Sequence, residues 1–321
     1  CARQTQGQVW CWGRNADGAL GYGPIAGLIR IQPPNSPLPN QGEDLITQDF
    51  WTGPHNSCAM VNDQYYCWGL EDRYGANFNS QLTGFSDSQP VRDQSNSNAP
   101  LQAGGQLTIS AYHICATDHL NHAYCWGIAG TNHNRLGSAG PNAPSARPIT
   151  HPQRRLLVFD QLFSTPYISE QNAGGQVTCG LSAGFELWCW GQNNFGILGE
   201  AASYATAQRV SIPGLDRLHH LAITTGKACA IHTDDSVLCW GLDRFITDNF
   251  YRHQTLVPVS FAESLAQAPS RLVDVQLQNR YFGLALEAVG DQFRAYGWGI
   301  PTIGNPQVFR RLQLVDDDVS F

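Results

Sequence analysis

The sequence predicts an all-β fold, a β-propeller with six recognisable four-stranded blades and room for a seventh. Three observations support this prediction. A pair of cysteines followed by Trp-Gly recurs along the 321 residues, the repeated tryptophans are 50 to 64 residues apart, and short strands of alternating character precede several of the pairs. A period of this length suits one propeller blade and exceeds most helical repeats. Residues 1–321 are therefore expected to form a single β-propeller domain.

The core of each repeat is a short segment bounded by two cysteines. Five copies are present: Cys1…Cys11-Trp12-Gly13, Cys58…Cys67-Trp68-Gly69, Cys115…Cys125-Trp126-Gly127, Cys179…Cys189-Trp190-Gly191 and Cys229…Cys239-Trp240-Gly241. A sixth copy ends in Trp298-Gly299 and has glycine, Gly283 and Gly297, at both cysteine positions. The blade cores are thus expected around residues 1–23, 58–69, 115–137, 179–199, 229–241 and 283–299.

The spacing of each pair fits a β-hairpin, because directly opposed residues of an antiparallel pair have a constant sum of residue numbers. With Cys1 opposite Cys11, Ala2 faces Trp10 and a three-residue turn ends in glycine. The Cys179 pair fits less well, because Gly184 is central in its turn, and the sixth copy should place Gly283 opposite Gly297. Opposed residues lie within disulfide range. The predicted disulfides are Cys1–Cys11, Cys58–Cys67, Cys115–Cys125, Cys179–Cys189 and Cys229–Cys239.

The cysteines also indicate the compartment. Ten cysteines in regular pairs, without a C-x-x-C spacing, favour an oxidising location, extracellular or periplasmic, over a cytosolic metal site. We therefore expect a secreted protein, processed or a fragment of a longer one. Cys1 could instead be an acylated lipoprotein cysteine, but its place in the repeat favours pairing with Cys11.

The full motif is a strand, a glycine turn, C-A-h (h is apolar), a turn, C-W-G-x-N-x-x-G-x-L-G and P-x-x-V. Its best copies run from Cys11 to Gly21 and from Cys189 to Gly199. It resembles the regulator of chromosome condensation repeat family, whose members form β-propellers of four-stranded blades, and the resemblance covers nearly the whole chain. The disulfides look like the secreted bacterial branch of that family. The family commonly has seven blades, whereas six cores are found here.

The end of the chain resembles the first strand of a further repeat. Residues 312–321 are expected to pair with the N-terminal hairpin and close a ring, or to pair with a neighbouring molecule, through a strand that includes Val315, Val319 and Phe321.

Composition excludes several classes of function. The net charge is −7, and one lysine with eighteen scattered arginines offers no clustered cationic surface for nucleic acid. No apolar run is long enough for a membrane span, and no catalytic or phosphate-binding motif is present. We therefore expect no enzyme activity and no cofactor.

Two clusters could hold a metal but have simpler explanations. The histidines His113, His119, His122 and His133 are interpreted as a polar hairpin tip, and Asp316 to Asp318 as a solvated strand edge rather than a calcium site. No metal site is predicted. The six repeat tryptophans are expected to pack between blades.

Function is expected in the segments between repeats, because propellers present variable loops on a rigid scaffold. The aromatic residues proposed as contacts are Tyr74, Phe78, Phe85, Phe245, Phe250 and Tyr251. Two hypotheses remain open. The chain is a secreted, non-catalytic module that binds an unidentified protein, or it is a structural subunit of an extracellular filament, sheath or surface layer that self-associates through its termini or loops.

Overall fold

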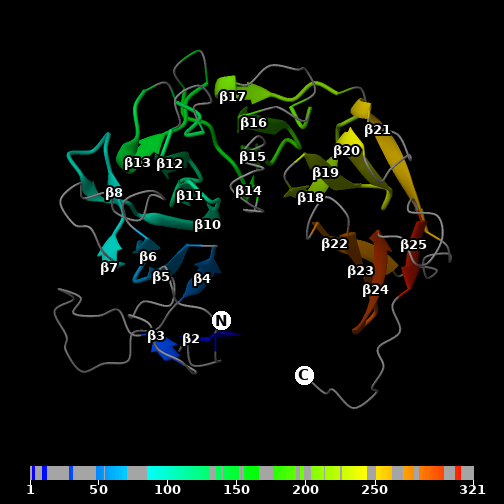
Figure 1. Cartoon of the computed structure of the whole chain (residues 1–321), viewed down its shortest axis with the longest axis horizontal. Helices are drawn as coiled ribbons and strands as arrows, with labels where there is room; N and C mark the ends of the chain where they lie inside the picture. The colour runs from blue at the N-terminus through cyan, green and yellow to red at the C-terminus, as the bar shows by residue number, and fades with distance from the viewer. Residues whose placement is uncertain are drawn as a thin grey trace. The chain divides into compact units, whose positions relative to one another are not determined.

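The computed structural model describes residues 2–3, 9–12, 29–31, 48–53, 55–70, 85–129, 135–138, 140–151, 153, 155–165, 176–192, 196–198, 204–212, 214–224, 226–243, 251–261, 270–277, 282–299 and 308–311. These residues form β-strands, turns and irregular segments, and no helix occurs among them (Figure 1). The all-β prediction is confirmed.

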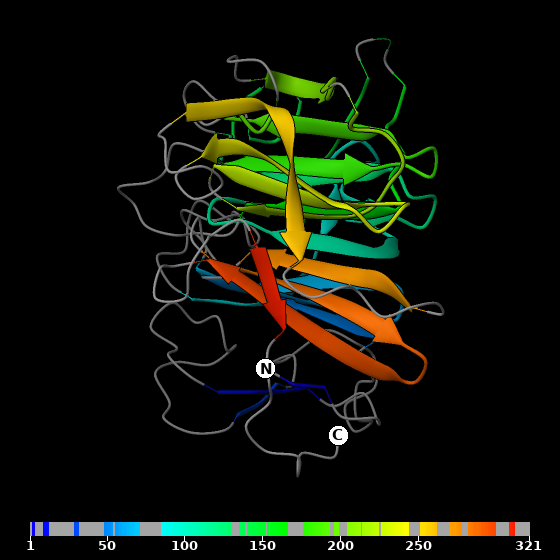
Figure 2. The same ribbon diagram turned by 90° about the vertical axis from the view of Figure 1, so that its right-hand side faces the viewer.

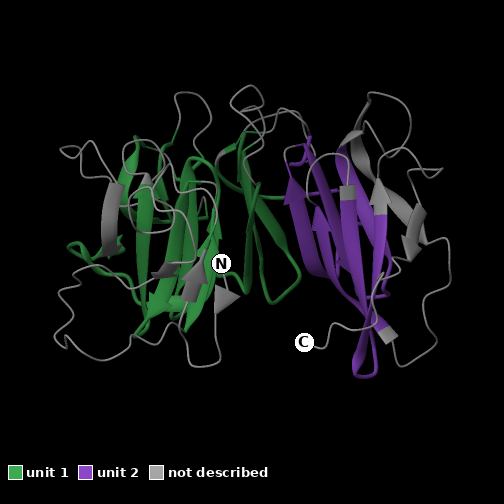
Figure 3. Ribbon diagram, turned by 60° about the horizontal axis from the view of Figure 1, so that its bottom comes forward, with its two compact units in different colours: residues 1–192, 203–209 green, residues 193–202, 210–321 purple. Residues whose placement is uncertain are grey.

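The chain divides into two compact units (Figure 3). Unit 1 holds residues 1–192 and 203–209, and unit 2 holds residues 193–202 and 210–321. Each unit is built mainly from antiparallel strands that follow one another in sequence.

Unit 1 contains four sheets, each carrying consecutive strands of one repeat. The first sheet is β1 (Ala2–Arg3), β2 (Val9–Cys11) and β3 (Ile29–Ile31). The second is β4 (Asp49–Thr52), β5 (Asn56–Val61), β6 (Gln64–Leu70) and β7 (Phe85–Pro90). The third is β10 (Ala103–Ile109), β11 (His113–Asp118), β12 (Ala123–Gly127) and β13 (Ala143–Pro148), extended by β8 (Arg92–Asp93) and β9 (Ala99–Pro100). The fourth is β14 (Gln161–Ser164), β15 (Val177–Leu181), β16 (Leu187–Gly191) and β17 (Tyr204–Arg209).

Unit 2 contains two four-stranded meanders. One is β18 (Leu218–Thr224), β19 (Lys227–His232), β20 (Val237–Asp243) and β21 (Tyr251–Phe261). The other is β22 (Ser270–Leu277), β23 (Phe282–Val289), β24 (Gln292–Gly299) and β25 (Val308–Arg311). The outer strands β21 and β25 pair in parallel, at Ser260 opposite Val308, and join the meanders into one eight-stranded sheet (Figure 2).

The predicted facing of the cysteines is confirmed in the described hairpins. Four disulfides are present, Cys58–Cys67, Cys115–Cys125, Cys179–Cys189 and Cys229–Cys239, each with Cα atoms 4.1 Å apart. This separation is close to the roughly 4.5 Å of non-hydrogen-bonded antiparallel pairs. In the first hairpin Ala2 faces Trp10, as the residue-number sum requires. Cys1 lies outside the described residues, so the Cys1–Cys11 bond stays a prediction.

The turns of these hairpins place one or two residues in the left-handed region. Asn62 and Asp63 form the two-residue turn with φ of 49° and 56°, and Asn121 and Asp235 end three-residue turns with φ of 63°. These residue types tolerate that conformation. The Cys179 hairpin keeps the same turn, but its left-handed residue is Phe185 with φ of 61°, next to the central Gly184.

Replacing Phe185 by asparagine is expected to stabilise the fold by about 0.5–1 kcal/mol, because a side chain with bulk at Cβ is strained at positive φ. Phe185 is 44% exposed, so little packing is lost. The measurement is the denaturant midpoint. Phe185→Ala is the control, since it removes the ring and keeps the strain; equal midpoints for the two variants would contradict the strain argument.

The expected facing in the sixth hairpin is wrong by one residue. Gly283 faces Trp298, and Leu284 faces Gly297. The reason is the turn: Val289 pairs with Gln292 and leaves the two-residue turn Gly290-Asp291, with Gly290 at φ 59°, where the sequence suggested an odd-length turn. In place of a disulfide, these strands carry the buried Glu287, whose Oε2 accepts a hydrogen bond from the Tyr296 hydroxyl at 2.7 Å.

The Trp-Gly step marks an irregularity in the sheet. In β6, β12, β16 and β20 the register toward the following strand shifts across Trp-Gly, and Gly69, Gly127, Gly191 and Gly241 have φ between 105° and 121°. A β-carbon on Gly191 would lie 2.3 Å from the carbonyl oxygen of Gln176. Glycine is therefore required here by both conformation and space.

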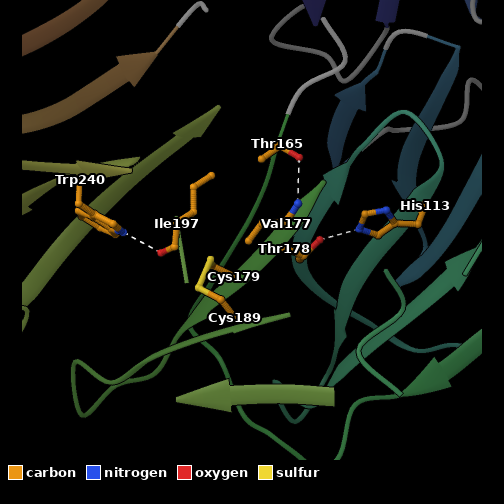
Figure 4. The surroundings of a disulfide bond; sticks show 8 residues. All are labelled: His113, Thr165, Val177, Thr178, Cys179, Cys189, Ile197 and Trp240. Carbon is orange, nitrogen blue, oxygen red and sulfur yellow. Dashed lines mark hydrogen bonds between the residues drawn. A yellow bond between two sulfur atoms is a disulfide. The ribbon is translucent and has the colours of Figure 1, made fainter. Parts of the chain in front are cut away.

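The repeat tryptophans pack into the core with one exception. Trp68, Trp126, Trp190 and Trp240 are buried, as predicted, and Trp190 stacks on Phe159 with ring centroids 6.2 Å apart. Trp240 donates its Nε1–H to the carbonyl oxygen of Ile197 at 2.8 Å (Figure 4). Trp12 is 54% exposed, which contradicts its expected burial. The Trp298 side chain lies outside the described residues.

Candidate functional site

Each meander has two different ends. The tight turn of its hairpin lies at one end, which we call the turn end. At the other, the open end, the second strand of the hairpin leaves through a connection to the strand that follows. These connections are residues 12–28, 71–84, 128–142, 192–203, 244–250 and 300–307. Because the paired cysteines are always nine or ten residues apart while these connections differ greatly, variation concentrates at the open end.

Most of the proposed contact residues fall outside the described part of the chain. Tyr74, Phe78, Phe245 and Phe250 belong to the connections 71–84 and 244–250, and residues 312–321, with Val315, Val319 and Phe321, are likewise outside it. Only the backbone of Phe85 and Tyr251 is described; each begins its strand, opposite Leu70 and Asp243 respectively. Their role in binding stays a prediction.

The histidine cluster is not assembled in the structure. His113 is buried at the open end of β11, whereas the exposed His119 and the half-buried His122 lie near the turn end of the same hairpin. His122 Nδ1 is 3.0 Å from Asp118 Oδ2, a contact that fixes the turn. His133 and Asp316 to Asp318 lie outside the described residues. Within the described part, no group of three or more His, Cys, Asp or Glu side chains could hold a metal ion.

At the open end of unit 1, His113 joins the third and fourth repeats. Its Nε2 lies 2.6 Å from Thr178 Oγ1 in β15, and both side chains are buried (Figure 4). Nearby, Val177 donates its backbone N–H to Thr165 Oγ1 at 3.2 Å. Burial, with a smaller effect from the positive charge of Arg135, lowers the pKa of His113 to about 3. The imidazole is therefore neutral at physiological pH.

The stability of the fold should fall on acidification because of His113. The unfolded chain binds a proton near pH 6.5 and the folded chain only near pH 3, so between these values the unfolded state holds more protons. This favours unfolding by about 1.4 kcal/mol per pH unit as the pH falls. We expect His113→Asn to have a shallower dependence of unfolding free energy between pH 6 and 4 than the wild type. The exposed His119→Asn is the control, and an unchanged slope in His113→Asn would refute the assignment.

Next to His113, a short anchored loop carries an arginine. Residues 135–138 are held by Leu136, which is fully buried, and by Gly137, whose φ is 65° and whose carbonyl oxygen accepts the Ala207 N–H at 3.3 Å. A β-carbon at Gly137 would meet the Trp190 ring at 2.8 Å, so the loop lies directly against that tryptophan.

Arg135 extends from this loop over an aromatic ring. Its guanidinium carbon is 4.7 Å from the centroid of Tyr112, a cation–π contact. Its Nε is buried and has no hydrogen-bond acceptor among the residues that the structure describes, and burial lowers the pKa of the guanidinium. In the sequence, Asn134-Arg135-Leu136-Gly137 stands out only as a weak copy of the turn after Trp-Gly. The available signal was an arginine at the position before Leu-Gly, where the better copies have the apolar residues Ala19 and Ile197.

The turn end of unit 1 is fixed by a buried tyrosine. The Tyr65 hydroxyl lies 3.0 Å from the carbonyl oxygens of Gln106 and Thr117 and accepts the Gly105 N–H at 3.0 Å. Burial raises its pKa to about 12. These contacts join the second and third repeats. The raised pKa of Tyr65 therefore follows from its burial in the core between these repeats.

Comparisons with known proteins agree with this geometry. No family model matches the chain. Mouse E3 ubiquitin-protein ligase HERC2 is 24% identical over 247 residues, 75% of this chain and 5% of HERC2. The mitochondrial RCC1 domain-containing protein RUG3 of Arabidopsis thaliana is 24% identical over 240 residues, 73% of this chain and 50% of RUG3. The chain is thus similar to RCC1-repeat proteins over about three quarters of its length.

Solved structures share the RCC1-repeat fold. Yeast RCC1 (Prp20) bound to Kap60 matches with a TM-score of 0.65 at 17% identity, covering 98% of this chain and 72% of Prp20. A second structure of Prp20, from Saccharomyces cerevisiae, matches with a TM-score of 0.62 at 19% identity, covering 98% and 74%. The β-propeller fold predicted from the sequence is thus confirmed. The match to the curated relatives spans half of RUG3 and a small part of HERC2. No helix in the described part of the chain is long and apolar enough to cross a membrane.

Proposed function

We propose that this RCC1-repeat chain is a secreted, non-catalytic module that binds another protein through the connections at the open ends of its meanders. The observation that carries the proposal is the contrast between hairpins of nearly constant length and connections such as 71–84 and 244–250, which differ in length and composition. A rigid scaffold with variable loops is the usual arrangement of binding proteins. The yeast protein Prp20, which shares the fold, forms a complex with Kap60, and its binding to Gsp1p and histones is also described.

The disulfides support the location in this proposal. Four buried cystines are present in the described part of the chain, and each closes a hairpin. Such bonds persist in extracellular or periplasmic surroundings and are reduced in the cytosol. The non-catalytic role is supported by the perturbed groups themselves. The large pKa shifts of His113 and Tyr65 follow from burial at contacts between repeats.

A second candidate function is self-assembly into a filament, sheath or surface layer. The observation that favours it is Trp12, which is exposed although its described counterparts in four other repeats are buried. An exposed tryptophan of this kind would gain from burial against another molecule.

The two candidates differ in size distribution, which light scattering of the oxidised chain measures over a wide concentration range. Binding to another protein predicts one discrete species near 35 kDa. Self-assembly predicts growth with concentration into regular fibres visible by electron microscopy, and loss of that growth in Trp12→Ser.

Partner binding is tested by replacing connection 71–84 with a Gly-Ser segment of equal length. We expect the saturable binding of a captured protein to be lost, while the same protein still binds the turn-end variant Phe185→Asn. Equal binding by the variant with the replaced connection would refute a role for this connection.

A further inference from the structure

The turn end of the third repeat carries an exposed apolar face. Six large apolar side chains are exposed in the described part of the chain, and three of them gather here: Leu120, Leu156 and Val158, with exposed fractions of 58%, 38% and 46%. Val158 pairs with His122, two residues after Leu120 in the same hairpin. Exposed apolar residues that lie on adjacent segments, and not singly, mark a surface that another molecule covers.

The segment 155–160 has apolar side chains on both of its faces. Leu157 and Phe159 point inward and belong to the core of unit 1, where they are 9% and 0% exposed. Leu156 and Val158 alternate with them and point outward. A strand with one face in water normally carries polar residues on that face. The outward face of this segment is therefore unlike that of a solvated strand.

The backbone of this segment is already paired on both sides. Phe159 donates its N–H to the carbonyl oxygen of Asn121 at 2.9 Å on the side of the hairpin. On the other side, the Arg155 carbonyl oxygen accepts the N–H of His151 at 2.8 Å. The segment is therefore not a free sheet edge to which a strand could be added. A partner has to contact its outward side chains.

Opposite charges stand at the two ends of the apolar face. Arg155 directly precedes Leu156, and Asp160 follows five residues after Arg155, about 16 Å away along an extended chain. Both side chains are exposed, and neither has an ion-pair partner among the residues that the structure describes. A stretch that is positive at one end, apolar in the middle and negative at the other end is complementary to an identical stretch in the antiparallel orientation.

We infer that this face, residues 155–160 with Leu120, is a contact between two copies of the chain related by a two-fold axis. The outward apolar side chains of the two copies pack together, and Arg155 pairs with Asp160 of the partner subunit at both ends. Such a contact uses the same surface on both copies, so it stops at a dimer. The inference goes beyond the proposed function, because the contact lies at the turn end and not at the open ends.

The first test is light scattering of the full oxidised chain over a wide range of concentration. We expect a reversible change from a species near 35 kDa to one of twice that mass, without further growth. A single species near 35 kDa at every concentration would overturn the inference while leaving the proposed binding function intact. Growth into fibres in place of a dimer would overturn it as well.

Charge reversal tests which residues meet across the contact. Arg155→Asp and Asp160→Arg, each measured alone, should weaken the dimer by about tenfold or more, because like charges then face each other at both ends. An equimolar mixture of the two variants should form a dimer again, because each mixed pair restores opposite charges at both ends. A misfolded variant could not be rescued by mixing. Failure of the mixture to form a dimer would overturn the antiparallel contact.

A further pair of variants tests the apolar centre. Val158→Ser should weaken the dimer by about tenfold or more, since it removes an apolar side chain from the middle of the contact. Phe293→Ser is the matched control, because Phe293 is 66% exposed on the hairpin of the sixth repeat and lies outside the proposed face. It should leave the dissociation constant of the dimer within about twofold of the wild type. Equal effects of the two changes would overturn the inference.

Discussion

Replacing Gly191 by alanine should lower the free energy of unfolding by about 3–5 kcal/mol, the largest effect expected for a single change here. Two terms add. The φ of Gly191 is 107°, which L-residues rarely adopt, and the new β-carbon would lie 2.3 Å from the carbonyl oxygen of Gln176, a backbone atom that cannot move aside cheaply. Denaturant unfolding followed by tryptophan fluorescence measures the loss.

Two glycine controls separate the terms. Gly105 has φ of 88°, and a β-carbon added there would have no neighbour within 4 Å, so Gly105→Ala reports conformational strain alone, about 1–3 kcal/mol. Gly184 has neither positive φ nor a close neighbour, and Gly184→Ala should be neutral or slightly stabilising. If Gly191→Ala costs no more than Gly105→Ala, the close approach to Gln176 is not what selects glycine.

Removing the Cys179–Cys189 disulfide by the double change to alanine should cost about 2.5–3 kcal/mol. The loop it closes spans a sequence separation of 10, and its loss returns conformational entropy to the unfolded chain. Both cysteines are fully buried, so lost packing adds to the effect. The measurement is the unfolding free energy of the oxidised protein.

The sixth hairpin supplies the comparison for this prediction. It folds without a disulfide and has the buried Glu287–Tyr296 hydrogen bond on its strands. Adding reductant to the native protein should therefore destabilise the hairpins that carry cystines and leave the hydrogen exchange of β23 and β24 unchanged. Equal loss of hydrogen-exchange protection in β23 and β15 would show that the disulfides stabilise the whole chain and not only their own hairpins.

Residue spacing was sufficient to predict which residues face each other in most of the hairpins. The facing of Cys115 and Cys125 follows from arithmetic on residue numbers, because an antiparallel pair has a fixed sum and a tight turn allows few lengths. The sixth hairpin shows the limit. The sequence does not distinguish a two-residue turn at Gly290-Asp291 from an odd-length turn. A difference of one residue in the turn changes the cross-strand partner of Gly297 from Gly283 to Leu284.

Residue spacing could not predict the contact between Arg135 and Tyr112. Tyr112 and Arg135 are 23 positions apart and belong to different connections of the third repeat, so their contact depends on how both connections end against the sheet. The histidines show the converse. His113 and His119 are near in sequence, but an extended strand separates them, so proximity along the chain suggested a cluster that the fold does not make.

The sequence by itself determined the repeat, the hairpins and the pairing of the cysteines in the described hairpins, because these depend on neighbours within one hairpin. The positive φ and close backbone approach that require glycine after tryptophan came from the structure. Only the tertiary structure decided that Trp12 is exposed, that His113 is buried against Thr178, and that Arg135 stacks on Tyr112 without a counter-ion among the described residues. Burial and pairing of these side chains are set by contacts between repeats and connections, and such contacts leave no periodic signal in the chain.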